Sequence, residues 1–544
     1  MWSASATGVM QYEVIELGTL LGWPANTEYR AWAVNDSNIV VGPAYRPDSG
    51  QAAAWVWSLC GRYTLPAETM RDLSAALCLS GNGSAFDINE ADLIVGEQVV
   101  APWNAPRGYV WQLPTIQAPQ TPCTAPQITG FVLAALTTNT NYGAYARSVN
   151  DAVPALIAGT SFADITSCDL GKPVRGFTYR MGDPATTLTT LAPSNTSAGN
   201  ASWGRGVSSE VPAKVGGYSD YLCTTSQCDD DHDGLRWTDG APLVPVPIGS
   251  AAGSTLFGAY VERLNNVGMG AGNALSDTWG CAKHAAFWNV AGGLTDLGGI
   301  GVNPVSESFG FGISPTILSG PVCVVGSTLE GAYDSVVWER HPTGAGFVWT
   351  GLKLSPIARE CGATWELREA RDVNSSGIIV GWGLRMPTSG PAAIHAFLLK
   401  PVCPGDLSGD CVVGSADLGV FLGLWGATAC VGNSKGPGFY ADFDASGQVS
   451  GADMSILLGG LWGTSCSGSA CGGNGCSQLE MASAAQGLEG DEAFQAPIDL
   501  ALLTFAAQSL GFESLDAMAS WIGQASPDEA TGVVESFLAI VNQD

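Results

Sequence analysis

The chain has 544 residues, which is long enough for two or more domains. Its formal net charge is −28, so it lacks the excess of Lys and Arg that binding to nucleic acid or to anionic membrane surfaces requires. Gly occupies 71 positions and only 13% of the residues are charged, a composition typical of a turn-rich, all-β protein.

The cysteine content indicates the compartment. The chain has 15 cysteines and none of the CxxC pairs that zinc sites use, so we expect disulfides, with one thiol left over. No stretch reaches the roughly 20 apolar residues that a membrane span needs. The sequence therefore predicts an extracellular or cell-surface protein, although no signal peptide is visible in this chain.

An internal repeat runs through the first 400 residues. The motif is a small residue, a β-branched residue and Asn or Ser, then an apolar pair ending in Gly, then an aromatic strand that ends in Trp or a similar residue. The first copy reads Ala33-Val34-Asn35, then Val40-Val41-Gly42, then Ala54–Trp57. The repeated glycines, 54 to 63 residues apart, are Gly42, Gly96, Gly159, Gly216, Gly272, Gly326 and Gly381. Including a short strand between copies, each unit has about four strands, which is typical of a propeller blade.

The repeat predicts an all-β fold, a seven-bladed β-propeller of four-stranded blades over residues 12–400. Sheets this small bury both faces only by stacking around an axis. The seventh copy has no strand after it, whereas Val14–Leu17 precedes the first copy. We therefore predict that Val14–Leu17 closes the ring as the outer strand of the last blade, pairing with His395–Leu399.

The units resemble the HAF repeat of probable extracellular bacterial proteins. The triplet that names this repeat is His395-Ala396-Phe397, and His284-Ala285-Ala286-Phe287 is close to it. The fourth and sixth copies depart from the pattern, with Ser208 and Ser314 at the Asn position. The resemblance implies a repeat scaffold outside the cell and is nearly silent on the ligand.

Two twelve-residue acidic loops follow the repeats. They are Asp406–Asp417 and Asp442–Asp453, which begin 36 residues apart. Each has acidic or hydroxyl oxygens at positions 1, 3 and 5 and a carboxylate at position 12, the spacing that folds oxygens around Ca²⁺. Each loop leads into an apolar segment that we expect to be helical, Leu418–Trp425 and Met454–Trp462.

This duplicated, EF-hand-like unit resembles a type I dockerin, with Asp rather than Glu at position 12. The resemblance implies two bound Ca²⁺ ions. The first would be held by Asp406, Ser408, Asp410, Asp417 and the carbonyl of Val412, and the second by Asp442, Asp444, Ser446, Asp453 and the carbonyl of Gln448. Two departures are expected to weaken the first site and cohesin docking: Cys411 replaces the usual Gly at position 6, and the helices lack basic residues.

Beyond the propeller we predict a dockerin-like module at 401–466, a Gly/Cys-rich linker at 467–490 and an acidic helical segment at 491–544. No hydrolase, phosphate-binding or zinc-protease motif occurs in the chain. We expect a secreted, non-catalytic binding or scaffold protein whose partner is a cohesin-like protein, another cell-surface molecule or a polysaccharide. One alternative is a carbohydrate-active propeller enzyme, a glycoside hydrolase or polysaccharide lyase, with carboxylates meeting at the propeller rim. The other is a purely structural envelope component.

Overall fold

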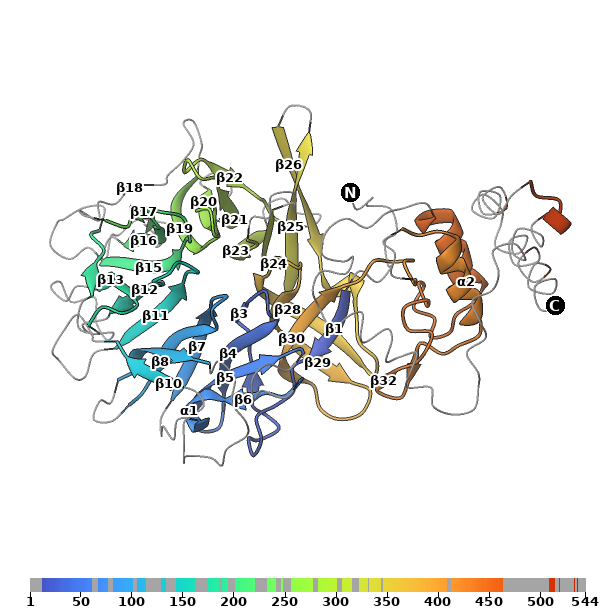
Figure 1. Cartoon of the computed structure of the whole chain (residues 1–544), viewed down its shortest axis with the longest axis horizontal. Coiled ribbons are helices and arrows are strands. Elements are labelled where there is room, and N and C mark those ends of the chain that lie inside the picture. Colours follow the sequence, from blue (N-terminus) through green and yellow to red (C-terminus); the bar gives the residue numbers. More distant parts are fainter. Residues whose placement is uncertain are drawn as a thin grey trace.

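The computed structural model of the chain describes residues 12–60, 67–76, 82–100, 105–113, 129–133, 143–161, 174–184, 188–193, 201–220, 232–240, 246–247, 256–276, 282–300, 306–315, 322–330, 332–343, 346–408, 412–462, 508–513, 518, 533 and 536. Over these ranges the chain forms seven sheets of four or five strands, arranged around a ring (Figure 1). The predicted seven-bladed β-propeller is therefore confirmed.

Each of the first six blades uses consecutive strands. Blades one to three contain β2 (Glu28–Tyr29), β3 (Ala33–Val34), β4 (Ile39–Tyr45), β5 (Ala52–Ser58) and β6 (Arg71–Asp72); β7 (Gly83–Ile88), β8 (Leu93–Gln98), β9 (Arg107–Gln112) and β10 (Thr129–Val132); and β11 (Ala144–Val149), β12 (Leu156–Ser161), β13 (Arg175–Arg180) and β14 (Thr189–Thr190). Blades four to six contain β15 (Ala201–Val207), β16 (Lys214–Asp220), β17 (His232–Thr238) and β18 (Val246–Pro247); β19 (Leu256–Leu264), β20 (Gly270–Ser276), β21 (Ala282–Trp288) and β22 (Leu294–Asp296); and β23 (Glu307–Ile313), β24 (Cys323–Leu329), β25 (Tyr333–Thr343) and β26 (Gly346–Lys353).

Blade seven joins the two ends of the propeller. It contains β28 (Ala363–Val373), β29 (Ile379–Pro387), β30 (Ala393–Pro401), β1 (Tyr12–Glu16) and β27 (Ala358–Arg359). In the antiparallel pair of β1 and β30, Val14 lies opposite Leu399 and Glu16 opposite Phe397, so the predicted ring closure is confirmed. β1 is not the outermost strand, however, because β27 pairs with it in parallel. The closed ring has no unpaired seam between its first and last strands.

The hydrophobic core lies between neighbouring blades. Ile39 and Val56 of blade one pack in one cluster with Ile94 and Trp111 of blade two, and similar clusters recur around the ring. The tryptophans near the end of the third strand are buried in five blades; they are Trp57, Trp111, Trp237, Trp288 and Trp338. The predicted aromatic strands therefore supply much of the surface that neighbouring blades bury against each other.

A β-bulge interrupts the innermost strand of blades two to seven at one place in the repeat. At this place the register between the first two strands skips one residue, and blades five and seven have a second shift nearer the start of the strand. The residues skipped at the shared place are Phe86, Arg147, Arg205, Glu262, Phe311 and Arg371. Each lies three positions before the Asn or Ser of the repeat, and the matching residue of blade one is Trp32. A bulge leaves a residue out of the strand pairing and re-aims its side chain, in this case toward the central channel.

The repeated glycine is explained by this bulge. A Cβ atom at Gly96 would lie 2.0 Å from the backbone oxygen of Ser84, two residues before the bulge of that blade. A Cβ atom at Gly381 would lie 2.0 Å from the backbone oxygen of Glu369. In the fourth copy this position belongs to Gly217 rather than the predicted Gly216, because Gly217 is the residue paired with Gly204 before the bulge. Only Gly allows the two backbones to approach this closely.

The repeated asparagine links its blade to the next one wherever it occurs. Asn89 Oδ1 accepts the backbone N–H of Leu93 at 2.9 Å, and its Nδ2 donates to the backbone oxygen of Asn150 in the following blade at 2.8 Å. The same link to the following blade is made by Asn35, Asn150, Asn265 and Asn374. Ser208 and Ser314 close their own turns through Oγ, but in the described ranges neither hydroxyl bonds to the next blade. We call these seven repeat positions, five Asn and two Ser, the asparagine ring; the five Asn positions make the inter-blade link.

A small helical module follows blade seven. It contains α2 (Ser415–Gly423), the hairpin of β31 (Cys430–Val431) and β32 (Ser434–Lys435), α3 (Gly451–Ile456) and the π-helical turn η3 (Leu457–Leu461). The predicted helical segments lie in α2 and in α3 with η3, and Phe421, Phe443 and Leu457 form part of their shared core. Figure 1 shows this module, coloured orange, beside β1 and blade seven.

Three kinds of contact attach the module to blade seven. A disulfide joins Cys361 to Cys430. Arg359 of β27 donates to the backbone oxygen of Asp442 at 2.7 Å. Glu13 of β1 accepts a hydrogen bond from the Tyr440 hydroxyl at 2.8 Å and also pairs with Lys435. The module is thus fixed to the two strands that complete the last blade.

The other described elements are short. α1 (Leu73–Ala76) and the 3-10 turn η2 (Ser355–Ile357) lie in connections between strands. None of the helices in the described ranges is long and apolar enough to cross a membrane. The predicted linker 467–490 and nearly all of the predicted helical segment 491–544 fall outside the described residues, but Met518 of that segment is buried in the core of the module.

Candidate functional site

The candidate site is the second predicted calcium loop, Asp442–Asp453, which leads into α3. Ser450 is the N-cap of this helix, and its Oγ accepts the N–H of Ala452. Asp453 lies in the first helical turn, where its Oδ2 accepts the N–H of Ser450 at 2.9 Å and its Oδ1 accepts the N–H of Asp444 at 3.0 Å. The start of the helix therefore holds position 12 of the loop beside position 3.

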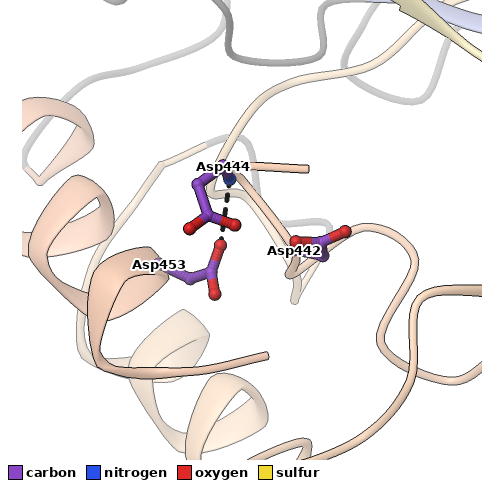
Figure 2. A group of neighbouring side chains, drawn as sticks. All are labelled: Asp442, Asp444 and Asp453. Carbon is purple, nitrogen blue, oxygen red and sulfur yellow. Dashed lines mark hydrogen bonds between the residues drawn. The ribbon is translucent and has the colours of Figure 1, made fainter. Parts of the chain in front are cut away.

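Three carboxylates converge in this loop. One oxygen from each of Asp442, Asp444 and Asp453 lies within 4.8 Å of the other two, and Figure 2 shows Asp453 reaching from the helix toward the loop. Asp442 and Asp453 are buried, whereas Asp444 is exposed. Ca²⁺–oxygen distances of about 2.3–2.6 Å place ligand oxygens up to about 5 Å apart across the ion, so this group could hold one metal ion.

The other predicted ligands of this loop lie at the same place. The hydroxyl of Ser446 is 3.4 Å from Asp442 Oδ1 and 3.1 Å from the carbonyl oxygen of Gln448. Gly447 has a φ of 96°, a conformation that suits Gly, and its N–H donates to Asp442 Oδ2 at 3.1 Å. The result is an all-oxygen donor set, which suits Ca²⁺ or Mg²⁺ better than a metal that prefers nitrogen or sulfur.

The electrostatics of the cluster show a deficit of positive charge. Burial raises the pKa of Asp442, and Arg359 opposes that rise. Burial and the neighbouring charge of Asp444 raise the pKa of Asp453. Burial also tends to raise the pKa of Asp444, but hydrogen bonds from Ser446 lower the pKa of that carboxyl overall. A divalent cation would relieve the repulsion among these groups.

The first predicted loop is described only in part. Asp410 and Cys411 lie outside the described residues, while Asp406 is half-buried, and Ser408 and Val412 are exposed. Asp417 is buried and matches Asp453, because its Oδ1 accepts the N–H of Ser408 at 2.8 Å and its Oδ2 accepts the N–H of Gly414 at 2.7 Å. The two loops therefore share the same backbone arrangement around position 12.

A second candidate site, which the sequence analysis did not identify, lies in the central channel. The seven residues three positions before the repeat Asn or Ser form what we call the channel ring: Trp32, Phe86, Arg147, Arg205, Glu262, Phe311 and Arg371. Together with Ser148 and Arg263 they line a cavity of about 50 Å³. Their identities differ from blade to blade, so only their fixed distance from the Asn could have revealed them.

Two of the carboxylates near this cavity bind the scaffold. Asp87 Oδ2 accepts the N–H of Val149 at 2.9 Å, and Asp372 Oδ2 accepts the N–H of Val34 at 3.0 Å, each in the next blade. The guanidinium of Arg263 forms ion pairs with both carboxylates, at 2.5 and 3.1 Å. Burial raises the pKa of Asp372 to about 7, against the opposing effect of Arg263. These two groups therefore join blades across the channel.

Comparisons with known proteins give no family assignment. No family model matches the chain, and no curated protein matches it. A protein of unknown function from Dyadobacter fermentans DSM 18053 is 11% identical and covers 73% of this chain and 100% of its own, with a TM-score of 0.34. A sialidase of Trypanosoma rangeli in complex with the inhibitor DANA is 8% identical and covers 51% of this chain and 56% of its own, with a TM-score of 0.27. An arginine-to-alanine triple mutant of AofleA from Arthrobotrys oligospora is 11% identical and covers 63% of this chain and 93% of its own, with a TM-score of 0.30.

Proposed function

We propose that this chain is a secreted, non-catalytic binding or scaffold protein in which a dockerin-like module binds Ca²⁺ and serves for attachment, while the propeller provides a rigid platform. The observation that carries the proposal is the convergence of Asp442, Asp444 and Asp453 within 4.8 Å at the start of a helix. Two loops in register, each with a buried Asp at position 12, support a pair of sites.

The joint between the module and blade seven supports the attachment role. The disulfide and the contacts of Arg359 and Glu13 fix the module to the propeller. A partner that binds the module would therefore also hold the platform. We propose a cohesin-like protein or another cell-surface molecule as that partner, bound through surfaces without Lys or Arg on α2 and α3.

Disulfide chemistry supports a location outside the cytosol. Cys60, Cys361, Cys403 and Cys430 are disulfide-bonded, whereas Cys323 is a free thiol among the described residues. Structural disulfides persist in oxidising compartments. The HAF-like repeats are consistent with the same location.

Calorimetric titration with CaCl₂ tests the proposal. The full chain, freed of metal with EDTA and dialysed, should bind two equivalents of Ca²⁺. The Asp453→Ala variant should lose the second site and the Asp417→Ala variant the first, each leaving about one equivalent. Asp183→Ala, which removes an exposed carboxylate on blade three, is the matched control and should keep both sites. Two equivalents retained after Asp453→Ala would contradict the assignment of the second loop.

A further inference from the structure

The channel ring gathers cations from different blades into one place. Arg147, Arg205 and Arg371 belong to the ring, and Arg263 lines the same cavity. Each ring arginine reaches the channel from a β-bulge. Bulges are a common means of aiming a side chain at a functional site. The distribution of acidic partners among these four arginines therefore decides what the cavity can accept.

Three of the four arginines have acidic partners within the protein. Arg205 lies 3.8 Å from Glu262 and donates to the Tyr218 hydroxyl at 3.2 Å. Arg371 pairs with Glu369, and Arg263 pairs with Asp87 and Asp372. These side chains are only partly exposed, between 20% and 23% for the three arginines, so their pairs are well shielded from bulk water.

Arg147 differs from the other three. Its guanidinium lies over aromatic rings, 4.1 Å from the centroid of Phe86 and 5.2 Å from that of Tyr145. It makes no hydrogen bond or ion pair with any residue that the structure describes. Burial, together with the like charge of Arg205, lowers the pKa of Arg147 to about 10. The carboxyls of Glu97 and Glu262 act in the opposite direction on this pKa, and burial raises the pKa of Glu97 itself to about 7.

A guanidinium in this position keeps donors available for a ligand. It presents five N–H groups in a planar fork that matches a carboxylate or a phosphate, and it cannot become neutral at physiological pH. Aromatic faces stabilise its charge but accept few of its hydrogen bonds. A cavity of about 50 Å³ has room for a group of a few heavy atoms, but not for a polymer chain.

We propose that the cavity inside the channel ring binds a small oxyanion, a carboxylate or a phosphate group, held by Arg147 with Arg205 and Arg371 on the adjoining walls. The ligand would be a free anion or the acidic end of a small sugar acid, whose ring would lie in the channel outside the cavity. This site is on the propeller and needs no metal ion, so it does not rest on the calcium-binding proposal.

Anion binding to the full chain, freed of metal with EDTA and then dialysed into a chloride-free buffer without EDTA, tests this site by calorimetry. Three probes should be compared: inorganic phosphate, acetate and glucuronate. We expect at least one probe to bind one site per chain in the millimolar range or tighter. Stronger binding of glucuronate than of acetate and phosphate would assign a sugar acid, and stronger binding of phosphate would assign a free or esterified phosphate; either result supports the shared chemistry.

The variants then locate the site. Arg147→Gln should weaken binding of the best probe by a factor of ten or more, whereas Arg147→Lys should retain part of the affinity because the charge remains. Arg236→Gln is the matched control, since Arg236 lies on β17 and donates to the backbone oxygen of Val290; it should bind like the unaltered protein. Circular dichroism establishes that each variant is folded. Absence of binding by all three probes, or unchanged affinity in folded Arg147→Gln, would overturn the proposal.

Discussion

The propeller and the C-terminal module treat buried charge in opposite ways. In the propeller, Asp87 and Asp372 share Arg263, so a cation of the chain itself partly offsets the two acidic groups. In the module, Asp442, Asp444 and Asp453 converge, and among the described residues Arg359 is the cation that pairs with the cluster. The propeller therefore needs no metal ion to offset these two carboxylates, whereas the module has a deficit of positive charge that the proposed Ca²⁺ would offset.

Removing the disulfide between the two regions is expected to have the largest effect on stability. Cys361 and Cys430 are 69 residues apart, and closing a loop of that length stabilises a fold by about 4 kcal/mol in the chain-entropy model. The Cys361→Ser/Cys430→Ser variant should therefore lower the stability of the module, read by hydrogen exchange in α2 and α3, and leave the strands of blades two to five unchanged. Cys323→Ser, at the free thiol, is the control. Equal loss of protection in those blades would mean that the two regions unfold as one unit.

Substitution of the glycine opposite the bulge is expected to cause the next largest loss of stability, and this loss concerns the propeller alone. Gly381→Ala brings a Cβ atom to 2.0 Å from the backbone oxygen of Glu369, and overpacking of this kind costs about 3 kcal/mol. Urea unfolding should show this loss in the propeller transition. Gly419→Ala is the matched control, because a Cβ there meets nothing within 4 Å and Ala favours the helix α2. Similar midpoints for Gly381→Ala and the unaltered protein would refute this explanation of the repeat.

A smaller difference in stability is expected between substitutions of Asn and of Ser at the repeat position of the asparagine ring. Asn89→Ala removes the bonds from the N–H groups of Ala91 and Leu93 and the bond to the next blade, and we expect a loss of about 2 kcal/mol. Ser208→Ala removes the bond from the N–H of Lys214 and a longer one to Glu210 at 3.3 Å, both within the same blade, and should cost less than half of that. Thermal unfolding of the two variants measures the difference. Equal losses would show that the inter-blade bond adds nothing.

The pH dependence of the stability of the propeller is expected to be the smallest of these effects. Burial raises the pKa of Asp372 to about 7 from an ordinary value near 4, so the folded propeller binds this proton more tightly than the unfolded chain. Stability should therefore fall as pH rises from about 4 to about 7, by about 1 kcal/mol or more. Asp372→Asn should reduce this slope in calorimetric scans made in EDTA, and the slope that remains is expected from Glu97, whose pKa is also raised to about 7. A stability that rises through the same interval in the unaltered protein would contradict the assigned direction.

The sequence was sufficient for the fold because the repeat encodes backbone requirements. Residues equivalent to Gly96 and Asn89 recur along the chain. The bulge requires Gly at the first position and the inter-blade hydrogen bond requires Asn at the second. The channel ring has no such sequence pattern, because a bulge accepts any side chain: Phe86 of blade two corresponds to Arg147 of blade three. The added strand β27 is only two residues long, too short for a periodic pattern.

The candidate metal site was predictable within the loop but not around it. Asp442, Asp444, Ser446, Gln448 and Asp453 come together because they are close in the chain and the loop spacing sets their positions. Arg359 reaches Asp442 from 83 residues away, and the partner of Cys361 depends on the same packing. Contacts of this kind follow from how the module sits on blade seven, and cysteine spacing alone does not give connectivity.

The proposed contrast between a propeller that needs no Ca²⁺ and a module that binds it is tested most directly by hydrogen exchange on the full chain, in Ca²⁺ and in EDTA. We expect Ca²⁺ to increase protection strongly in α2, α3 and the loop 442–453, with Asp453→Ala losing that gain around α3. The strands of blades one to six should exchange at the same rate in both buffers. Protection of the module that is identical in Ca²⁺ and in EDTA would contradict the account.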